Sequence, residues 1–308
     1  MDKTLCVFFS TERTYFAIVT PSPKGMELDF IATTSEPIDL ENLDSTYSHK
    51  GLEEFYEIAK AIKSDYDTIN FAIPIENTIV SEFPARPNIT NDEIMSIINI
   101  EIRQNYPLFN PQEFPTYLFE LSPRKNQPFY LSIIIPKLVF KNLKTIANKL
   151  NKPVQRIEIS QISAQNAFLY NYPEEQTKIS ALLNISDKFV DFSLLNGSNF
   201  IWYSLIKFNS PDEIPQLIND KINELSKVIN FQIDSMYLFG FGLSKILFNE
   251  ISNSFSNKSS IIKRLNAFRM FTTKADETTR TICARLSHHF PACIGCAIPD
   301  YHKRIKIY

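Results

Sequence analysis

The sequence predicts an α/β protein made of two lobes with the same order of strands and helices, and a smaller subdomain inserted in the first lobe. Residues 5–74 and residues 179–242 each read as three strands, a helix and a fourth strand. The segment 76–153 between these copies has a different order, with two helices among four strands. We therefore expect a first lobe over residues 1–173, which contains the inserted segment, and a second lobe over residues 174–308.

The first copy begins with short apolar segments separated by turn residues, a pattern that predicts strands. The amphipathic stretch GLEEFYEIAKAIK follows them and predicts a helix. The expected strands span residues 5–9, 14–19, 26–34 and 68–74, and the expected helix spans residues 51–63.

The first helix of the inserted segment has well-defined boundaries. Thr90 and Glu93 form a capping box, in which each side chain satisfies a free backbone N–H group at the start of the helix. Isoleucines then recur at four-residue spacing from Ile94, which gives the helix one apolar stripe. Pro107 ends it, because proline lacks the N–H donor and clashes with the preceding turn. We therefore expect a helix over residues 91–106.

The whole inserted segment follows a βαββαβ order. This order suits a small ferredoxin-like sheet with both helices on one face. A short helix over about 161–170 and a polar hinge at 172–175 then lead into the second copy. The expected strands of the insert are 77–84, 116–121, 129–136 and 154–160, and its expected helices are 91–106 and 137–150.

The second copy repeats the plan of the first. Its helix starts with Ser210-Pro211-Asp212-Glu213, which offers a cap, a proline in the first turn and a box glutamate. Pro215 leaves the start uncertain by one turn. The expected strands are 179–185, 189–197, 200–208 and 235–242, and the expected helix runs from about 211 to 231.

The charge balance excludes several classes of function. The 308 residues include 32 Lys and Arg and 34 Asp and Glu, so the net charge is -2 and no global field attracts nucleic acid or an anionic membrane. No apolar run reaches the roughly 18 residues that a membrane-spanning helix needs, and the first 20 residues do not read as an export signal. Four cysteines in so long a chain do not make a disulfide framework. We therefore expect a cytoplasmic protein with reduced thiols and no direct membrane insertion.

The order of elements resembles that of actin-like ATPases, whose ribonuclease H-like fold consists of duplicated βββαβα lobes. The inserted piece is similar to the bacterial FtsA and PilM branch of these proteins. Specific support for a PilM-like protein comes from the segment that enters the insert. There a strand ends in Phe83-Pro84, a helix starts with Asp92-Glu93-Ile94, and Glu101 precedes the closing Pro107 by six residues.

The resemblance also shows which chemistry is missing. Actin-like ATPases hold nucleotide phosphates on two Asp-x-Gly hairpin turns, where glycine lets the backbone approach and aspartate organises Mg²⁺. The first turn here has Phe8 at the carboxylate position and serine in place of glycine, and the second has asparagine and serine. The glycine-rich adenosine loop is reduced to LFGFG. The degenerate nucleotide site would consist of Ser10, Thr11, Asn184, Ser186, Asp187, Gly240 and Gly242.

Without an anchored Mg²⁺ the chain lacks much of what drives phosphoryl transfer, so the sequence predicts a pseudo-ATPase with no catalytic residues and no cofactor. Gly240 and Gly242 are interpreted as a turn between a strand and a helix. The alternatives are weak residual nucleotide binding and an active, ATP-binding actin-like ATPase that has moved its Mg²⁺ ligand to Asp187 or elsewhere.

The resemblance to PilM implies a scaffold of a type IV pilus or secretion assembly platform at the cytoplasmic face of the inner membrane. Its partner would be a bitopic inner-membrane protein, held through that protein's cytoplasmic N-terminal segment near the inserted subdomain. Self-association of the scaffold stays open. The candidate partner-binding residues are Phe83, Pro84, Arg86, Tyr106 and Phe109, between prolines that fix the turns at both ends of the helix 91–106. An equally supported interpretation places Phe83 and Tyr106 in the core of the insert.

Two other clusters contain residue types that are found in metal-binding or charged-ligand sites. His288, His289, Cys293 and Cys296, with Cys283 nearby, are residue types that bind zinc, but a second Cys pair is absent and ACIGCAIP is apolar, so buried core is the favoured interpretation. The basic residues Lys263, Arg264 and the tail 302–306 are interpreted as solvated surface, since they lack a long apolar face.

Overall fold

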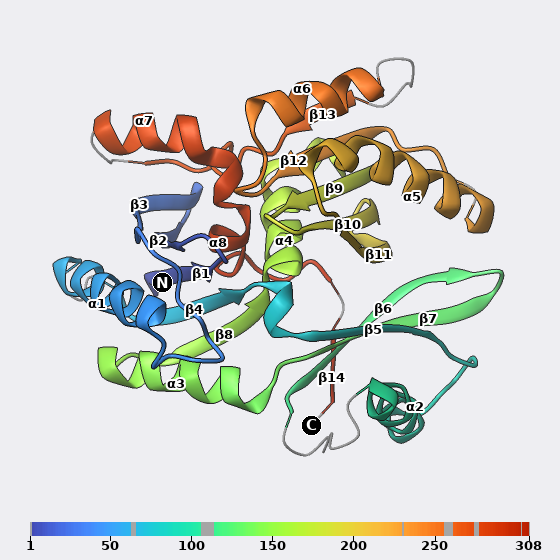
Figure 1. The fold of residues 1–308 in the computed structure, drawn as a ribbon, viewed down its shortest axis with the longest axis horizontal. Coiled ribbons are helices and arrows are strands. Elements are labelled where there is room, and N and C mark those ends of the chain that lie inside the picture. Colours follow the sequence, from blue (N-terminus) through green and yellow to red (C-terminus); the bar gives the residue numbers. More distant parts are fainter. Residues whose placement is uncertain are drawn as a thin grey trace.

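The computed structural model describes residues 2–62, 66–105, 114–229, 231–255, 261–273, 277–302 and 304–307. Figure 1 shows two lobes side by side, a central helix between them, and a smaller subdomain below the second lobe. The duplicated α/β plan and the inserted subdomain that the sequence predicts are thus confirmed.

The first lobe is built on a five-stranded sheet with the order β3-β2-β1-β4-β8, in which β1, β2 and β3 are antiparallel and β4 and β8 run parallel to β1. Side chains alternate along β1, so Leu5, Val7 and Phe9 pack under two helices while Cys6 and Phe8 face the opposite side. Its elements are β1 (Thr4–Phe9), β2 (Thr14–Ser22), β3 (Gly25–Thr33), α1 (Thr46–Ala61), β4 (Thr68–Ile73), α3 (Lys137–Leu150) and β8 (Val154–Ile159).

The second lobe repeats this arrangement with the order β11-β10-β9-β12-β13. Its helices α5 and α6 cover one face of the sheet. Ser210 makes no capping bond, and Glu213 instead accepts from the backbone N–H of Asn209 at 3.1 Å. Its elements are β9 (Ile179–Ile185), β10 (Phe189–Asn196), β11 (Asn199–Lys207), α5 (Ile214–Val228), β12 (Ser235–Phe239), α6 (Lys245–Ser254) and β13 (Ile261–Arg264).

The central helix α4 (Ser160–Asn171) lies between the two sheets. All its residues except Tyr170 are buried, because Phe168 and its neighbours pack against both lobes. A helix that is buried on every side has no solvent-facing stripe, so its polar residues must bond internally. Gln161 and Gln165, for example, both donate to the hydroxyl of Ser193 on β10 at 2.8 Å.

The inserted subdomain is a four-stranded antiparallel sheet with the order β14-β6-β7-β5, covered on one face by α2. The predicted capping box is present, since Glu93 accepts from the backbone N–H of Thr90 at 3.0 Å and the Thr90 hydroxyl accepts from that of Glu93 at 3.4 Å. The helix begins at residue 91 as expected. The elements are β5 (Ile79–Pro84), α2 (Asn91–Asn105), β6 (Thr116–Arg124), β7 (Gln127–Ile134) and β14 (Arg304–Ile307).

The structure divides the chain differently from the prediction at two places. The order βαββαβ is present from β5 to β8, residues 79–159, but β8 pairs with β4 and α3 packs with Phe55 of α1 in the core of the first lobe. The insert proper is therefore β5-α2-β6-β7. Sequence order alone could not separate these cases, because both give strand, helix and strand in the same succession.

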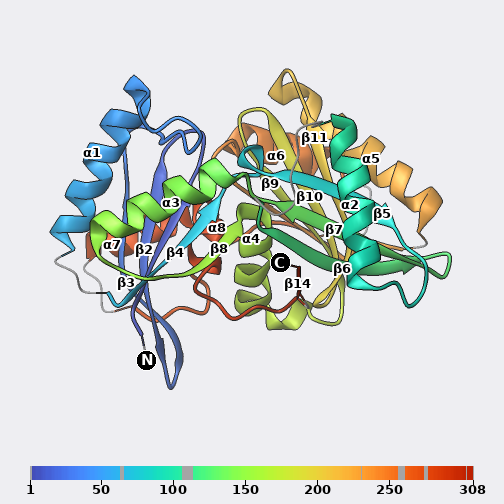
Figure 2. The same ribbon diagram turned by 90° about the horizontal axis from the view of Figure 1, so that it is seen from below.

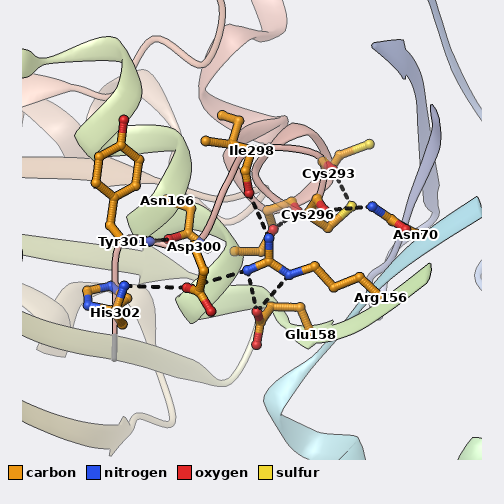
Figure 3. Close-up of polar contacts among 12 residues, drawn as sticks. Asn70, Arg156, Glu158, Asn166, Cys293, Cys296, Ile298, Asp300, Tyr301 and His302 are labelled. Atoms are coloured by element: carbon orange, nitrogen blue, oxygen red, sulfur yellow. Dashed lines mark hydrogen bonds and ion pairs between the residues drawn. The ribbon is translucent and has the colours of Figure 1, made fainter. Parts of the chain in front are cut away.

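The second correction concerns the C-terminal part of residues 174–308. The helix α8 (Pro291–Gly295) packs against the first lobe, and β14 joins the sheet of the insert. Figure 3 shows Arg156 of β8 holding this segment by donating to the carbonyl of Ile298 at 2.7 Å and by pairing with the carboxylate of Asp300 at 3.5 Å. The helix α7 (Glu277–Leu286) and short 3₁₀ turns at 75–77, 173–175, 211–213 and 287–289 complete the fold.

Candidate functional site

The first predicted phosphate turn, between β1 and β2, is closed by its own serine. The Ser10 hydroxyl donates to the carbonyl of Arg13 at 2.7 Å. The same oxygen accepts from the backbone N–H groups of Glu12 at 3.2 Å and Arg13 at 3.1 Å. A hairpin of this kind binds a phosphate through free N–H groups, and two of those groups are already bonded here.

The second turn, between β9 and β10, repeats the same network. The Ser186 hydroxyl donates to the carbonyl of Phe189 at 3.1 Å and accepts from the N–H groups of Lys188 at 3.3 Å and Phe189 at 3.0 Å. The backbone N–H of Ser186 also donates to Phe189, as that of Ser10 does to Arg13. In both lobes, therefore, a serine side chain occupies the amides that an anion would need.

The two turns also contact each other across the cleft between the lobes. The Thr11 hydroxyl donates to the carboxylate of Asp187 at 3.1 Å. The space left among Ser10, Asn184, Ser186 and Phe241 is about 10 Å³. That volume holds about one water molecule, so this space between the two turns has no room for a phosphate group.

The glycines of the third loop serve close contacts within the protein. Gly240 has φ +102°, and its N–H donates to the carbonyl of His288 at 2.9 Å. The N–H of Gly242 donates to the carbonyl of Ile185 at 2.9 Å. A Cβ atom on Gly242 would lie 2.1 Å from the carbonyl oxygen of Ser186. Both glycines let the β12–α6 loop approach the second turn, where the N–H of Gly242 is engaged, while that of Gly240 is engaged by His288.

A buried carboxylate beside the second turn was missed in the sequence. Asp191 on β10 accepts from the hydroxyl of Tyr203 at 2.7 Å and from the amide of Asn184 at 3.1 Å. Burial raises the pKa of Asp191 to about 7, and the nearby negative charge of Glu76 adds to this. Burial also raises the pKa of Glu76. The sequence feature that indicates this buried carboxylate is an aspartate within the apolar strand FVDFSLL.

The predicted partner residues are only partly available at the surface. Phe83 is 2% exposed and stacks on Tyr130 under α2, so this ring belongs to the core of the insert and its assignment to the partner surface is wrong. Pro84 is exposed. Arg86 is exposed too and is paired with Glu93 of the capping box. Tyr106 and Phe109 lie outside the described residues.

An open groove of about 710 Å³ lies beside the insert, and sequence reasoning did not find it. Four successive residues of β5, from Ile79 to Glu82, line one side, together with Glu101 and Ile102 of α2. Residues 203–205 and Lys207 of β11 line the other side. Figure 2 shows β5, α2 and β11 gathered in this part of the molecule.

A clamp between the insert and the second lobe lies at this groove. Arg124 of β6 donates two hydrogen bonds to Glu82 of β5, one of them at 2.8 Å. Its guanidinium lies 3.5 Å from the centre of the Trp202 ring of β11 and 4.1 Å from that of Phe129. A planar cation between Phe129 of β7 and Trp202 of β11, bonded to Glu82 of β5, ties the insert to the second lobe.

The cysteines and histidines near the C-terminus are spread through the core. Figure 3 shows the Cys293 and Cys296 region beside Asn70, whose amide donates to the carbonyl of Cys296 at 2.8 Å. The Cys293 thiol donates to the carbonyl of Cys6 at 3.4 Å, and burial raises its pKa, whereas a metal needs thiolate. Burial lowers the pKa of His288 to about 4. Within the described ranges, no three His, Cys, Asp or Glu side chains are arranged to hold a metal ion.

The basic cluster on β13 lies against aromatic rings. The Lys263 ammonium lies 5.7 Å from the ring centre of Tyr237, and the Arg264 guanidinium 5.0 Å from that of Phe248. In the tail, His302 is buried and the side chains from 303 onward are outside the described part. None of the helices that the structure describes is long and apolar enough to cross a membrane.

Known structures resemble this chain over nearly its full length. The "PilM-PilN type IV pilus biogenesis complex" matches 96% of this chain and 97% of its own, with a TM-score of 0.70 and 13% sequence identity. A Bacteroides thetaiotaomicron protein of actin-like ATPase fold and unknown function matches 87% of this chain and 95% of its own, with a TM-score of 0.55 and 12% identity. No protein-family model and no curated protein matches the sequence. The chain has the actin-like ATPase fold, and the resemblance to PilM-like proteins is confirmed at the level of the fold.

Proposed function

We propose that this chain is a non-catalytic actin-like scaffold, a pseudo-ATPase, of a type IV pilus or type II secretion-like assembly platform at the inner membrane. The observation that carries the proposal is the closure of both phosphate turns by Ser10 and Ser186, with about 10 Å³ left between them. An ATPase needs free turn amides and an anchored Mg²⁺, and neither is offered by these residues. The likeness to the PilM–PilN complex supports the choice of machine.

The partner in this proposal is a bitopic inner-membrane protein that presents its cytoplasmic N-terminal segment to the insert. The protein itself stays in the cytoplasm and reaches the membrane through that partner. The open groove beside β5 supports this location, because it is large and lies on the insert. The near-neutral charge, -2 for the chain, supports a protein partner over nucleic acid.

The alternative is an ATP-binding enzyme with a relocated Mg²⁺ ligand. The observation in its favour is that Asp187 and Glu76 lie close enough for the charge of Asp187 to raise the pKa of Glu76. Carboxylates that gather at a cleft are the ligands that Mg²⁺ prefers. Against it, Asp187 is engaged by Thr11 from the other lobe.

Isothermal titration calorimetry with millimolar Mg-ATP separates the two proposals. The scaffold proposal expects no binding heat above dilution, since the turn amides are occupied. Binding in the micromolar range, lost in Asp187→Asn but kept in Asp212→Asn, would overturn it in favour of the enzyme. Capture of membrane proteins on the immobilised chain tests the scaffold proposal. Failure to retain any bitopic inner-membrane protein would contradict that proposal.

A further inference from the structure

The strand β5 ends the sheet of the insert with one edge that faces the groove. In the described part of the chain β5 pairs only with β7, in antiparallel register with Ser81 opposite Ser132 and Phe83 opposite Tyr130. The N–H of Ala85 donates to Pro128 at 2.9 Å, which sets the alternation of the ladder. Since antiparallel neighbours bond at every second residue, Ser81 and Phe83 bond toward β7, and the main-chain groups of Val80 and Glu82 point outward.

The walls of the groove leave room for one more strand beside this edge. The helix α2 covers one face of the insert sheet, while Arg124, bonded to Glu82, meets Trp202 of β11 on the other face. The groove is lined by both walls and by consecutive residues of β5, so it runs along the edge itself. Its volume of about 710 Å³ lies within the range of sites that enclose ligands.

The charge of the lining is acidic. Its carboxylates are Glu76, Glu82 and Glu101, against the single cation of Lys207. Arg124 neutralises Glu82, and the Lys207 ammonium lies 5.8 Å from the Phe189 ring centre. Glu101 is exposed on α2 and Glu76 lies at the start of the groove. An incoming segment therefore meets the exposed carboxylate of Glu101, which favours a basic side chain beside α2.

Apolar side chains line both sides of the groove, with Ile79, Val80 and Leu131 on the insert and Leu205 on β11. Leu205 is 37% exposed there, and the Phe189 ring is nearby in the same groove. Successive side chains of a strand point to opposite sides, so an added strand would direct alternate residues toward Glu101 on α2 and toward Leu205 on β11. This geometry fits a segment in which basic and apolar residues alternate.

We propose that the groove binds an extended segment of alternating basic and apolar residues as a fifth strand, bonded to the main chain of Val80 and Glu82. The segment belongs to a partner protein, and the proposal rests on the scaffold function above for that source. Pro84 has no N–H, so it limits the pairing to the part of β5 that precedes it. The Arg124 clamp holds the groove open before the segment arrives, which reduces the entropy lost on binding.

Fluorescence anisotropy with a labelled Lys-Val-Lys-Val-Lys-Val peptide tests the proposal. We expect it to bind about tenfold more tightly than the matched Glu-Val peptide and than a version N-methylated at alternate residues on its bonding edge. Equal binding of the N-methylated peptide would show that no strand is added and would overturn the proposal. Dimers of the chain that the peptide dissociates would assign the groove to a second copy and overturn it as well.

A matched pair of charge reversals locates the binding. Glu101→Lys on α2 is expected to weaken binding of the Lys-Val peptide about fivefold and to reduce its salt dependence, while Glu57→Lys on the exposed face of α1 leaves both unchanged. Equal effects of the two variants would mean nonspecific attraction and contradict the groove. Circular dichroism melts of both variants confirm that they fold.

The same variants keep this inference separate from the scaffold function. If the wild type and Glu101→Lys retain the same bitopic membrane protein equally, the scaffold function stands and the groove proposal falls. If no membrane partner is retained while the peptide binds at the groove as described, the scaffold function falls and the strand-binding groove stands as a site for another protein partner.

Discussion

The cleft between the lobes and the groove beside the insert differ in how their polar groups are satisfied. In the cleft, Ser10 and Ser186 bond the turn amides, and Thr11 bonds Asp187 across the gap. In the groove, the main chain of Val80 and Glu82 points outward beside exposed Glu101. The polar groups of the cleft bond one another, whereas the outward main-chain groups of β5 face the groove. Binding capacity is therefore expected where polar groups lack internal partners.

The two hairpin turns are nearly identical in their bonds although their sequences differ. Ser10 precedes Thr11-Glu12-Arg13, and Ser186 precedes Asp187-Lys188-Phe189. One serine at the same place in each turn suffices for the same closure, because its hydroxyl both donates and accepts. Closure is thus a property of both lobes.

Among the variants at the closed cleft, Gly242→Ala is expected to have the largest effect on stability. The added Cβ would lie 2.1 Å from the carbonyl oxygen of Ser186, a backbone atom that cannot move without disturbing the turn. We expect a loss of about 3 kcal/mol or more in the free energy of unfolding, measured by urea denaturation. Glu250→Ala, on an exposed position of α6, is the control. A loss below about 1 kcal/mol would mean that the loop and the turn are not in contact.

The clamp at the groove beside the insert is tested by Arg124→Met, which keeps much of the side-chain volume but removes the charge. Glu82 then loses its partner beside the Trp202 ring. We expect about 2 kcal/mol of destabilisation, discounted because the Glu82 side chain is 21% exposed. Arg103→Met on the exposed face of α2 should stay within about 0.5 kcal/mol. Equal stability of the two variants would contradict a clamp.

The buried carboxylate between the two regions gives a pH dependence. The pKa of Asp191 is raised to about 7 by burial, against about 4 for an unfolded aspartate. The folded state thus holds a proton that the unfolded state releases, so the stability contributed by Asp191 is complete below about pH 4 and is lost as pH rises through about 7. Asp191→Asn should remove roughly 2 kcal/mol of this decline, measured by urea unfolding between pH 5 and 8.

Glu76 faces Asp191 and carries a raised pKa of the same sign, so part of the decline should remain in the Asp191→Asn variant. Parallel pH profiles of the wild type and Asp191→Asn would show that Asp191 is ionised in the fold. Glu250→Gln, at an exposed position of α6, is the control and should leave the profile unchanged.

The smallest expected effect comes from Thr11→Val. This change removes the hydrogen bond to Asp187, but both residues are exposed and water replaces the lost partner. We expect less than about 0.5 kcal/mol in unfolding free energy. A loss above about 1.5 kcal/mol would mean that contact between the turns, rather than closure within each turn, holds the cleft shut.

The sequence predicted those features that depend on a few neighbouring residues. The capping box at Thr90 and Glu93 and the strands of both lobes follow from local pattern, and the structure confirms them. The place of Ser10 in the first hairpin turn also followed from the sequence, because it needs only the register of one hairpin. The binding site is predicted less accurately than the fold, since Phe83 is buried and the sequence does not indicate the groove.

By itself, the sequence determined the order of elements, the repetition of that order and the residue types at both turns, since each is set by side chains a few positions apart. Only the tertiary structure decided that β8 joins the first sheet, that Phe83 faces inward and that β5 leaves an edge beside β11. It also decided that Thr11 meets Asp187, 176 residues away. Such contacts depend on which surfaces meet after folding, and local periodicity carries no signal for them.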